Sequence, residues 1–464
     1  MRFFAKTILF TLIIFTSLNL SYSYEFRYVK DVQVGNEPVG VYYDNQKEQF
    51  HIICKGTDRN FNGKFEPDSG DVVPSWWVLK IDKLGEIVEV KKVKEFPFGS
   101  IPFPFRPTFV PNERKIWINH YDGISAYNLD NYESVGNKIE IFGVTSLDYK
   151  SGHLLIAQSS FAGKIDTAFV YSINQKKIMN KYPTGINLVQ ARMYQPQNPD
   201  FKGVAAISVG NFGSDSSIFH KSEFLHFQEP IFENTIIGNT ANYLEIADDR
   251  FVAIPVMMSN KLVFTDLQNQ SFFTEIELGE PSWDGPSFTK FLNISKTPNK
   301  QKFLVLTTTY AGKLQIHDFT YENDQGYSYL ISFVTDLDLN SKGEALAFSD
   351  TDNEGNAKIV VANSVKSDYS PNNTVSVILI KDLLSTISTN QIDNNLFRIN
   401  NNTLEYLGEQ SQNYEISIYN LYGNKILSSH SQTITNLKNL PNGVYFAIVV
   451  QGNKIHNFKF TYIK

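Results

Sequence analysis

A pair of short strands joined by a turn recurs along this chain and limits what the chain can fold into. In the clearest copy, Phe303–Thr307 is mostly apolar, Gly312 lies in the turn, and Lys313–Asp318 is a second strand that ends on a polar residue. Six further copies are His51–Lys55 with Val78–Asp82, Ile116–His120 with Ser125–Asn128, Leu154–Gln158 with Ala168–Ile173, Ala205–Val209 with Phe224–Phe227, Phe251–Pro255 with Leu262–Asp266, and Ala345–Ser349 with Ile359–Asn363. The copies recur at intervals of roughly 40–65 residues, the range of propeller repeats.

A single hairpin of this kind cannot bury both faces of its sheet, so each copy needs neighbours. A closed ring supplies them and leaves no bare edge. We therefore predict an all-β fold in which residues 24–382 form a seven-bladed β-propeller. The composition agrees with this prediction, because 14% of the residues are aromatic and aromatic side chains pack well on strands.

Charge and cysteine content narrow the classes of partner and compartment. The 464 residues carry a net charge of −6 without a basic stripe, so no nucleic-acid partner is expected. The only cysteine, Cys54, lies in an apolar strand, where a small buried thiol is the ordinary interpretation. Because no internal disulfide can form, the fold must be stabilised by its core.

Residues 1–23 have the three regions of a secretory signal peptide. Arg2 and Lys6 supply positive charge, Ile8–Phe15 is apolar except for Thr11, and Ser21–Ser23 offers small residues for cleavage. The alternative, a membrane anchor, is less favoured because the apolar run is shorter than the ~20 residues needed to span a bilayer. We predict an exported protein whose mature chain has no transmembrane segment.

The start of the mature chain predicts how the ring closes. Phe26–Val34 is an extended segment that could complete the blade formed by the other end of the propeller. The turn in Val34–Val41, with its glycines and proline, resembles the turn that opens blades in YVTN/YncE-like seven-bladed propellers, and related turns occur at Gly99–Pro107 and Gly279–Pro281. The resemblance covers roughly residues 34–380 and implies the fold, not the function.

A loop between the two strands of the first repeat carries the clearest metal-binding pattern. Oxygen side chains fall at Asp58, Asn60 and Asn62 and are followed by Gly63, as in the opening of an EF-hand-type calcium loop. The glycine permits the turn that brings the next carbonyl to the ion. The further predicted ligands are the carbonyl of Lys64 and the carboxylates of Glu66 and Asp71. Ser69 stands where the usual bidentate Glu would be, so we predict a structural calcium ion rather than a sensor; the alternative is a polar surface turn.

Exposed aromatic and polar residues provide candidates for ligand binding. Trp76 and Trp77 are adjacent on a strand and point to opposite faces, so one can pack in a core while the other lines a groove. Arg106 lies just before the end of the proline-rich segment Phe96–Pro107, which cannot be a ladder strand and could form a rim of the central channel. The remaining candidates are His120, at a strand end, and Trp283, in a loop. Each of these positions also has a purely structural interpretation.

Motifs for catalysis are missing from the sequence. The eight histidines are scattered without metal-ligand spacing, and no H-E-x-x-H, G-x-S-x-G or P-loop pattern occurs. We assign no catalytic residue. A propeller can assemble a site from single residues on several blades, so a hydrolase or lyase with its site in the channel stays open as an alternative.

The composition changes near residue 383. The Ser, Thr and Asn residues there show no hydrophobic periodicity and predict a linker over residues 383–395. Residues 396–464 then form a small β-domain. Asn420 and Gly423 bound one predicted hairpin turn and Pro441–Gly443 forms another. Strands that contain Tyr419 and Tyr445 flank these turns, Leu440 precedes the second one, and a basic strand runs to Lys464.

These C-terminal segments resemble the type A sorting domain of type IX secretion. The resemblance implies a small β-sandwich that is recognised by the type IX secretion machinery. It also implies passage through the periplasm, followed by release to the outside or attachment at the outer-membrane surface.

The sequence as a whole therefore predicts an exported propeller with a structural calcium loop and a sorting domain. We expect a binding module for a glycan, a peptide or a surface partner. Convergence of Arg106, His120, Asp122, Arg192 and Asp284 in one pocket would favour the enzyme alternative, whereas aromatic side chains on a shallow face would favour binding.

Overall fold

The computed structural model is almost entirely β-structure and divides into two compact units, one of Phe26–Asp350 with Ala357–Ile380 and one that contains the C-terminal residues from Lys381. Each unit is described by itself. The structure describes residues 25–59, 66–96, 106–120, 123–160, 165–211, 214–225, 231–296, 299–323, 327–352, 356–366, 368, 370–381, 397–400, 403–406, 414–420, 425–429, 433–434, 437, 440, 443–451 and 454–462. The predicted signal peptide and linker lie outside these residues.

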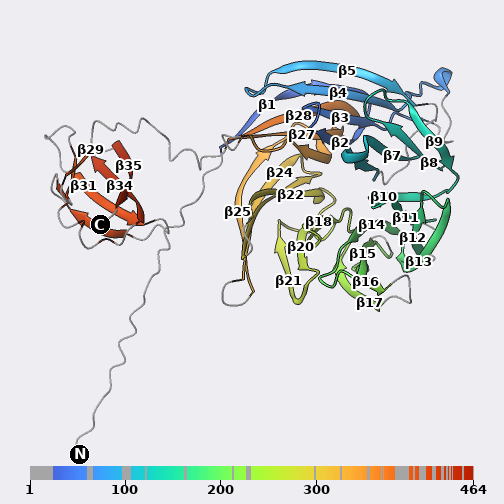
Figure 1. Ribbon diagram of the computed structural model, residues 1–464. Helices are drawn as coiled ribbons and strands as arrows, with labels where there is room; N and C mark the ends of the chain where they lie inside the picture. The colour runs from blue at the N-terminus through green and yellow to red at the C-terminus, as the bar shows by residue number, and fades with distance from the viewer. Residues whose placement is uncertain are drawn as a thin grey trace, which may run out of the picture. The chain divides into compact units, whose positions relative to one another are not determined.

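The larger unit is a β-propeller, in which the described residues form seven four-stranded sheets around a central axis (Figure 1). We number the sheets 1 to 7 in chain order. Sheet 1 contains β2 (Pro38–Asp44), β3 (Gln49–Cys54), β4 (Ser75–Ile81) and β5 (Ile87–Glu95), and sheet 2 contains β6 (Thr108–Val110), β7 (Lys115–His120), β8 (Gly123–Asn128) and β9 (Ser134–Ile139). Sheet 3 contains β10 (Val144–Lys150), β11 (His153–Gln158), β12 (Ile165–Ser172) and β13 (Lys177–Ile186), and sheet 4 contains β14 (Leu188–Tyr194), β15 (Phe201–Ser208), β16 (Ser217–Leu225) and β17 (Ile231–Gly238).

Sheets 5 to 7 continue this order. Sheet 5 contains β18 (Glu245–Ala247), β19 (Phe251–Val256), β20 (Lys261–Asp266) and β21 (Asn269–Glu277), and sheet 6 contains β22 (Pro286–Lys296), β23 (Lys300–Thr309), β24 (Lys313–Glu322) and β25 (Ser328–Asp338). Sheet 7 contains β26 (Lys342–Phe348), β27 (Ala357–Val365), β28 (Pro371–Lys381) and β1 (Glu25–Gln33). In every sheet the strand named first lies nearest the axis, and in sheet 7 the outer strand, β1, comes from the start of the propeller sequence (Figure 1).

Strand β1 joins the two ends of the propeller, as the extended segment Phe26–Val34 led us to expect. It lies beside β28 in sheet 7, and the Ser376 hydroxyl donates a hydrogen bond to Asp31 Oδ1 at 2.7 Å. The backbone amide of Val34 donates to the carbonyl of Asn373 at 2.7 Å. The first and last strands of the propeller therefore share one sheet, which closes the ring without a free edge at the junction.

The predicted strand pairs correspond to hairpins of the structure, but two of the seven pairs differ from the structure in which strand, or which part of a strand, they cover. Six pairs are the second and third strands of their sheets, but Ala345–Ser349 with Ile359–Asn363 falls on the first and second strands of sheet 7. In sheet 4 the third strand begins at Ser217 rather than Phe224. The polar residues His220 and Lys221 interrupt its apolar pattern, so the sequence revealed only the end of that strand.

Apolar clusters lie between neighbouring sheets and stabilise the ring. One cluster joins Val189, Ala205 and Ile207 of sheet 4 to Val252 and Ile254 of sheet 5. Inner strands are buried on both faces, as in β3, where all six residues including Cys54 are buried and only Gln49 and His51 are polar. Each fully buried Val, Leu or Ile contributes about 1.5–3 kcal/mol. The outer strand β5 instead has only exposed and partly exposed residues.

The C-terminal unit is a small β-sandwich. Its sheets are β29–β30–β33 and β32–β31–β34–β35, and side chains of both share one core. The strands are β29 (Phe397–Asn400), β30 (Thr403–Tyr406), β31 (Tyr414–Asn420), β32 (Lys425–Ser429), β33 (Thr433–Ile434), β34 (Gly443–Gln451) and β35 (Lys454–Tyr462).

The first predicted turn of this unit joins a real hairpin, because β31 and β32 pair antiparallel. The prediction of a second hairpin at Pro441–Gly443 is wrong: β34 pairs with β31 and β35 rather than with the preceding β33. Leu440 and Tyr445 are buried in the core on either side of this turn. The chain therefore passes from one sheet to the other between β33 and β34.

Candidate functional site

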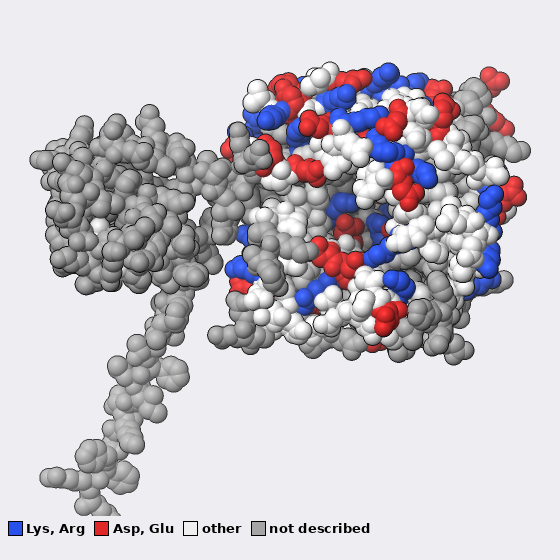
Figure 2. Space-filling model, viewed as in Figure 1, with Lys and Arg blue, Asp and Glu red and all other residues white. Residues whose placement is uncertain are grey.

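A cavity of about 450 Å³ lies on the propeller axis, and its charged and aromatic lining makes it the candidate binding site. Side chains on or beside the first strands of all seven sheets line it, and basic and acidic groups are visible inside the central hollow in Figure 2. The predicted candidate Arg106 is among the lining residues. Because the strands nearest the axis converge there, residues far apart in the sequence meet in one place.

Four charged residues on consecutive first strands form a row that we call the charged belt: Asp148, Arg192, Glu245 and Lys290. Their backbone partners on the second strands each lie three residues before that strand ends, so the four positions are equivalent. Arg192 lies 3.3 Å from Asp148 and 3.7 Å from Glu245, and Lys290 lies 3.6 Å from the other oxygen of Glu245. The belt therefore alternates negative and positive groups across sheets 3 to 6.

Aromatic rings complete the cavity wall next to the belt. Tyr243 packs on Phe288 with ring centroids 3.9 Å apart, and the guanidinium groups of Arg106 and Arg192 lie over the Tyr243 ring at 5.2 and 5.8 Å. The Tyr243 hydroxyl also accepts a hydrogen bond from Arg192 at 2.8 Å. These contacts hold both guanidinium groups in place, which gives the wall a defined shape before any ligand arrives.

Tyr42, at the equivalent position on β2, brings a phenol to the cavity wall. Its ring stacks on Phe109 at 5.3 Å, and its hydroxyl makes no hydrogen bond with any residue that the structure describes. Burial raises the pKa of the Tyr42 phenol well above its ordinary value. The group therefore stays protonated and is available as both donor and acceptor.

Burial also affects the carboxyl groups around the cavity. It raises the pKa of Asp148, although Arg192 acts in the opposite direction. The pKa of Glu344 is likewise raised by burial, and this carboxyl accepts a hydrogen bond from Tyr310 at 2.6 Å and feels the charge of Arg106. Each cation of the wall thus has a carboxyl group close to it.

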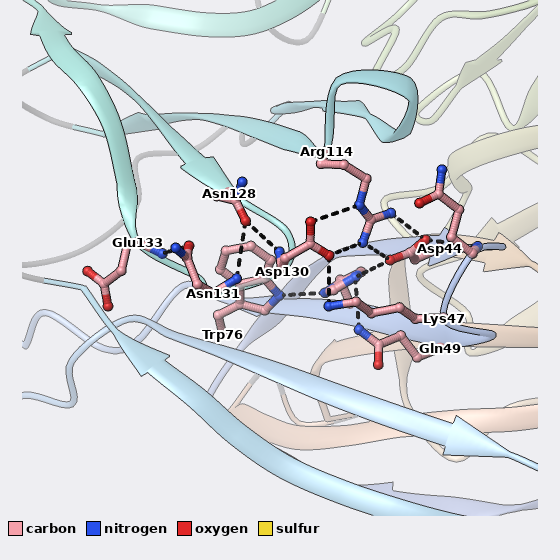
Figure 3. Close-up of polar contacts among 11 residues, drawn as sticks. Asp44, Lys47, Gln49, Trp76, Arg114, Asn128, Asp130, Asn131 and Glu133 are labelled. Atoms are coloured by element: carbon pink, nitrogen blue, oxygen red, sulfur yellow. Dashed lines mark hydrogen bonds and ion pairs between the residues drawn. The ribbon is translucent and has the colours of Figure 1, made fainter.

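Trp76, one of the predicted ligand-binding residues, lies fully buried between sheets 1 and 2 within a polar chain (Figure 3). Its Nε1–H donates to His51 Nδ1 at 3.1 Å. Because indole nitrogen is a donor only, His51 Nδ1 accepts this hydrogen bond and carries no proton. His51 Nε2 lies 3.5 Å from Asp44 Oδ2 and 3.3 Å from the side-chain nitrogen of Gln49. Trp76 therefore orients a buried histidine in the core.

The same series of polar contacts continues from Asp44 to residues of sheet 2 (Figure 3). Arg114 makes two parallel hydrogen bonds to Asp44, at 2.8 and 2.7 Å, and also reaches Asp130 at 2.9 Å. Burial pushes the pKa of Asp44 upwards, but hydrogen bonds from His51 and Arg114 outweigh it and the pKa lies well below the usual range. This network ties the two sheets together and lies outside the cavity wall.

The other predicted ligand-binding residues do not line the cavity. Trp77 is half-buried and donates to the Ser75 hydroxyl, and His120 is buried and 2.9 Å from the Ser125 hydroxyl. Trp283 is exposed on a loop before β22. Arg106 and Arg192 meet in the cavity, Asp284 instead pairs with Lys342, and Asp122 lies outside the described residues.

A second cavity, of about 490 Å³, is lined by residues of sheets 3 and 4, including His220 and Asn234. His220 Nε2 lies 2.8 Å from the hydroxyl of Ser208, and Nδ1 lies 2.7 Å from Asn234 Oδ1, the order of a nucleophile, a base and an orienting group. However, the backbone N–H of Gly185 also donates to Nε2 at 3.1 Å, and Ser208 is fully buried. We interpret the hydrogen bonds of His220 as structural contacts that connect sheets 3 and 4.

Hydrogen bonds join the two ends of the predicted calcium loop. Thr57 and Val72 form an isolated antiparallel bridge, and both oxygens of Asp71 accept backbone amides, from Arg59 and from Glu66, at 2.9 Å. These hydrogen bonds hold the pKa of Asp71 below its usual range. Asp58 is nearly buried and Glu66 is exposed, whereas Asn60, Asn62 and Lys64 lie outside the described residues. Within the described residues, no three His, Cys, Asp or Glu side chains cluster as a metal site.

The sequence prediction named Arg106 and Arg192 but missed most of the cavity wall, including Tyr42 and the other three residues of the charged belt. These residues lie on first strands, whereas the repeats were recognised from their second and third strands. Aligning the seven repeats would have placed the belt residues in one column, which is the signal that was available.

Among solved structures, similar chains include BBS1N in complex with ARL6DN, soaked with mercury (10% identity, TM-score 0.48, covering 76% of this chain and 96% of that one). The extracellular domain of the putative hybrid two component system BT4673 from B. thetaiotaomicron matches at 12% identity and TM-score 0.45, over 94% of this chain and 59% of that one. BamB from Moraxella catarrhalis matches at 10% identity and TM-score 0.40, over 76% of this chain and 99% of that one. No curated protein matches the sequence. The fold assignment rests on the sheet topology and not on these likenesses.

The C-terminal unit has a family match. Residues 393–463 match the family described as "Secretion system C-terminal sorting domain". Of the predicted motif, Tyr419 and Asn420 pair with β34, and Gly443 begins that strand, while Gly423 and Lys464 lie outside the described residues. No helix in the described part of the chain is long and apolar enough to cross a bilayer. Residues 393–463 are thus a secretion-system sorting domain, and they mark the chain for export by type IX secretion to the cell surface or the extracellular space.

Proposed function

We propose that this protein is an exported binding module that holds its ligand in the axial cavity. The observation that carries the proposal is the cavity wall itself, where a preorganised charged belt, stacked aromatic rings and the Tyr42 hydroxyl converge; among the described residues, this hydroxyl has no hydrogen-bond partner. A volume of about 450 Å³ suits a small ligand or one residue of a larger one. The ligand classes considered are a glycan, a peptide or a surface partner.

A hydrolase or lyase in the same cavity is the weaker candidate. General acid–base chemistry needs a carboxyl group free to exchange its proton with the substrate. Asp148 and Glu245 are instead ion-paired with Arg192, and Glu344 accepts from Tyr310. These pairings favour holding a ligand over transforming it.

Filling the cavity tests the proposed function. Ala347 is buried in the cavity wall on β26, so Ala347→Trp should occupy ligand space, whereas Val88→Trp on the exposed outer face of β5 is a matched control. Saturation-transfer NMR with a panel of soluble oligosaccharides and peptides should show ligands that contact the wild type and the control but not Ala347→Trp. Circular dichroism of the three proteins checks that all are folded. Equal binding by Ala347→Trp, or no binding by any protein, would refute the proposal.

We also propose that the loop at residues 58–71 holds a structural calcium ion. Asp58, Glu66 and Asp71 would supply carboxylate oxygens, Asn60 and Asn62 amide oxygens, and Lys64 its carbonyl. The oxygen-rich composition suits a hard cation, and the pinned base of the loop supports the proposal because it limits what an ion must still order.

Three finer assignments complete the proposal. Residues 1–23 are a signal peptide, which agrees with export through the periplasm before the sorting domain is recognised. The type IX machinery is the partner of that domain. The propeller is of the YncE-like, seven-bladed kind, an assignment supported by the seven four-stranded sheets within the described residues.

A further inference from the structure

The charges of the cavity wall identify the chemical class of ligand that it suits. Three cations, Arg106, Arg192 and Lys290, face the cavity. Two carboxyl groups of the belt, Asp148 and Glu245, lie within ion-pair distance of Arg192 or Lys290, and the Glu344 carboxyl interacts electrostatically with Arg106. Among the described residues, these cations are therefore matched by carboxyl groups and leave no surplus of positive charge.

An anionic ligand would gain little from such a wall. To pair with Arg192 it would have to displace Asp148 or Glu245, which would leave a carboxylate buried without its partner. That exchange costs several kcal/mol in general. Asp350, an exposed residue of the same wall, adds further negative charge.

A hydroxyl group fits the belt better than an ion does. Carboxylates only accept hydrogen bonds and guanidinium or ammonium groups only donate them, whereas a hydroxyl does both. A hydroxyl placed between Asp148 and Arg192 can donate to the first and accept from the second without breaking their ion pair. The next pairs along the belt, Arg192 with Glu245 and Glu245 with Lys290, repeat the arrangement. Adjacent hydroxyls on one molecule would match this repeat.

The aromatic part of the wall supplies the second requirement of such a ligand. The stacked pairs Tyr42–Phe109 and Tyr243–Phe288 present flat apolar surfaces in the same cavity. The C–H faces of a sugar ring can pack on these surfaces while its hydroxyls reach the belt. The Tyr42 hydroxyl, which has no hydrogen-bond partner among the described residues, would form a hydrogen bond with a sugar bound in this way.

We propose that the cavity binds a neutral carbohydrate, with ring hydroxyls bridging the alternating groups of the charged belt. This inference rests on the proposed function, because it names the ligand class of the same site. It predicts binding that is insensitive to ionic strength, since no net charge is exchanged. It also predicts that acidic sugars of equal length bind less tightly than neutral ones.

The probes are neutral hexasaccharides (xylo-, manno- and laminari-oligosaccharides) and acidic ones (oligogalacturonate and oligoalginate), measured by titration calorimetry with the full-length protein. We expect at least one neutral probe to bind, with Kd changing less than about twofold between about 50 and about 500 mM NaCl. Tyr42→Phe should weaken this binding by about five- to tenfold and Arg192→Met by more than about tenfold. The matched control Tyr327→Phe, at an exposed tyrosine outside the wall, should leave it unchanged.

The outcomes separate the two proposals. Tighter binding of the acidic probes with a strong salt dependence would overturn the neutral-sugar inference, as would cavity-dependent binding of peptides alone; either result would leave the binding function standing. Absence of binding by every neutral probe to the folded wild type would also overturn it. If a neutral probe binds equally to wild type and Ala347→Trp, the axial cavity is not the site and both proposals fail.

Discussion

Asp44 is the residue whose replacement most directly tests how adjacent sheets are joined. Its side chain is fully buried and accepts two hydrogen bonds from Arg114, at 2.8 and 2.7 Å, in addition to the contact with His51 (Figure 3). Asp44→Asn keeps the size of the side chain but removes its charge and turns an N–H group towards the guanidinium. Arg114 would then keep only Asp130 as its acidic partner.

The expected loss of stability follows from burial. Removing one partner of a buried ion pair typically costs about 3–5 kcal/mol. The entropy of unfolding is about 2.1 cal/mol/K per residue, or about 0.7 kcal/mol/K for a unit of roughly 350 residues, so this loss lowers Tm by about 4–7 °C. Asp130, whose side chain is about half exposed, is the matched control. Asp130→Asn should cost no more than about 1 kcal/mol, or about 1 °C.

Differential scanning calorimetry of the wild type, Asp44→Asn and Asp130→Asn measures both shifts in one experiment. A Tm for Asp44→Asn within about 1 °C of the wild type would refute the reasoning. Equal shifts in the two variants would do the same, because burial would then not set the strength of the contact.

Three further predictions concern pH, metal and export. Burial lowers the pKa of His317 to about 4, so the unfolded chain binds a proton at this histidine before the folded protein does, and the free energy of unfolding should fall by about 3 kcal/mol from about pH 6.5 to about pH 4. Urea unfolding should show a shallower pH dependence for His317→Gln than for the wild type, and equal pH dependences would contradict the assignment. Calcium should raise Tm in the wild type and in the control Asp68→Ala but not in Asp58→Ala/Asn62→Ala; a retained calcium effect in the double variant removes the metal proposal. A chain ending at Asn390 should accumulate as a folded propeller in the periplasm; its appearance in the medium or at the cell surface on immunoblots would contradict the sorting role.

The sequence was informative where burial is uniform or a motif is local. The second strands of the sheets are buried on both sides, so they contain short apolar runs, such as Ile52–Cys54 in β3 and Phe303–Leu306 in β23, that could be recognised without coordinates. The sorting domain was equally accessible because its turns and strands are close together in the chain. The third strand of sheet 4 was only half recognised, since His220 and Lys221 face polar partners there and hide the apolar period.

Side-chain neighbours across the ring were decided by the tertiary structure. Asp148 and Arg192 are 44 residues apart, and each is an unremarkable charged residue in its own strand. Trp76, equally plausible as a ligand platform or a core residue, became part of the core because sheet 2 packs over it. Local sequence patterns therefore determined the strands and the export of this protein. The cavity and its belt arose only on closure of the ring, because closure brings equivalent positions of separate repeats within hydrogen-bond reach.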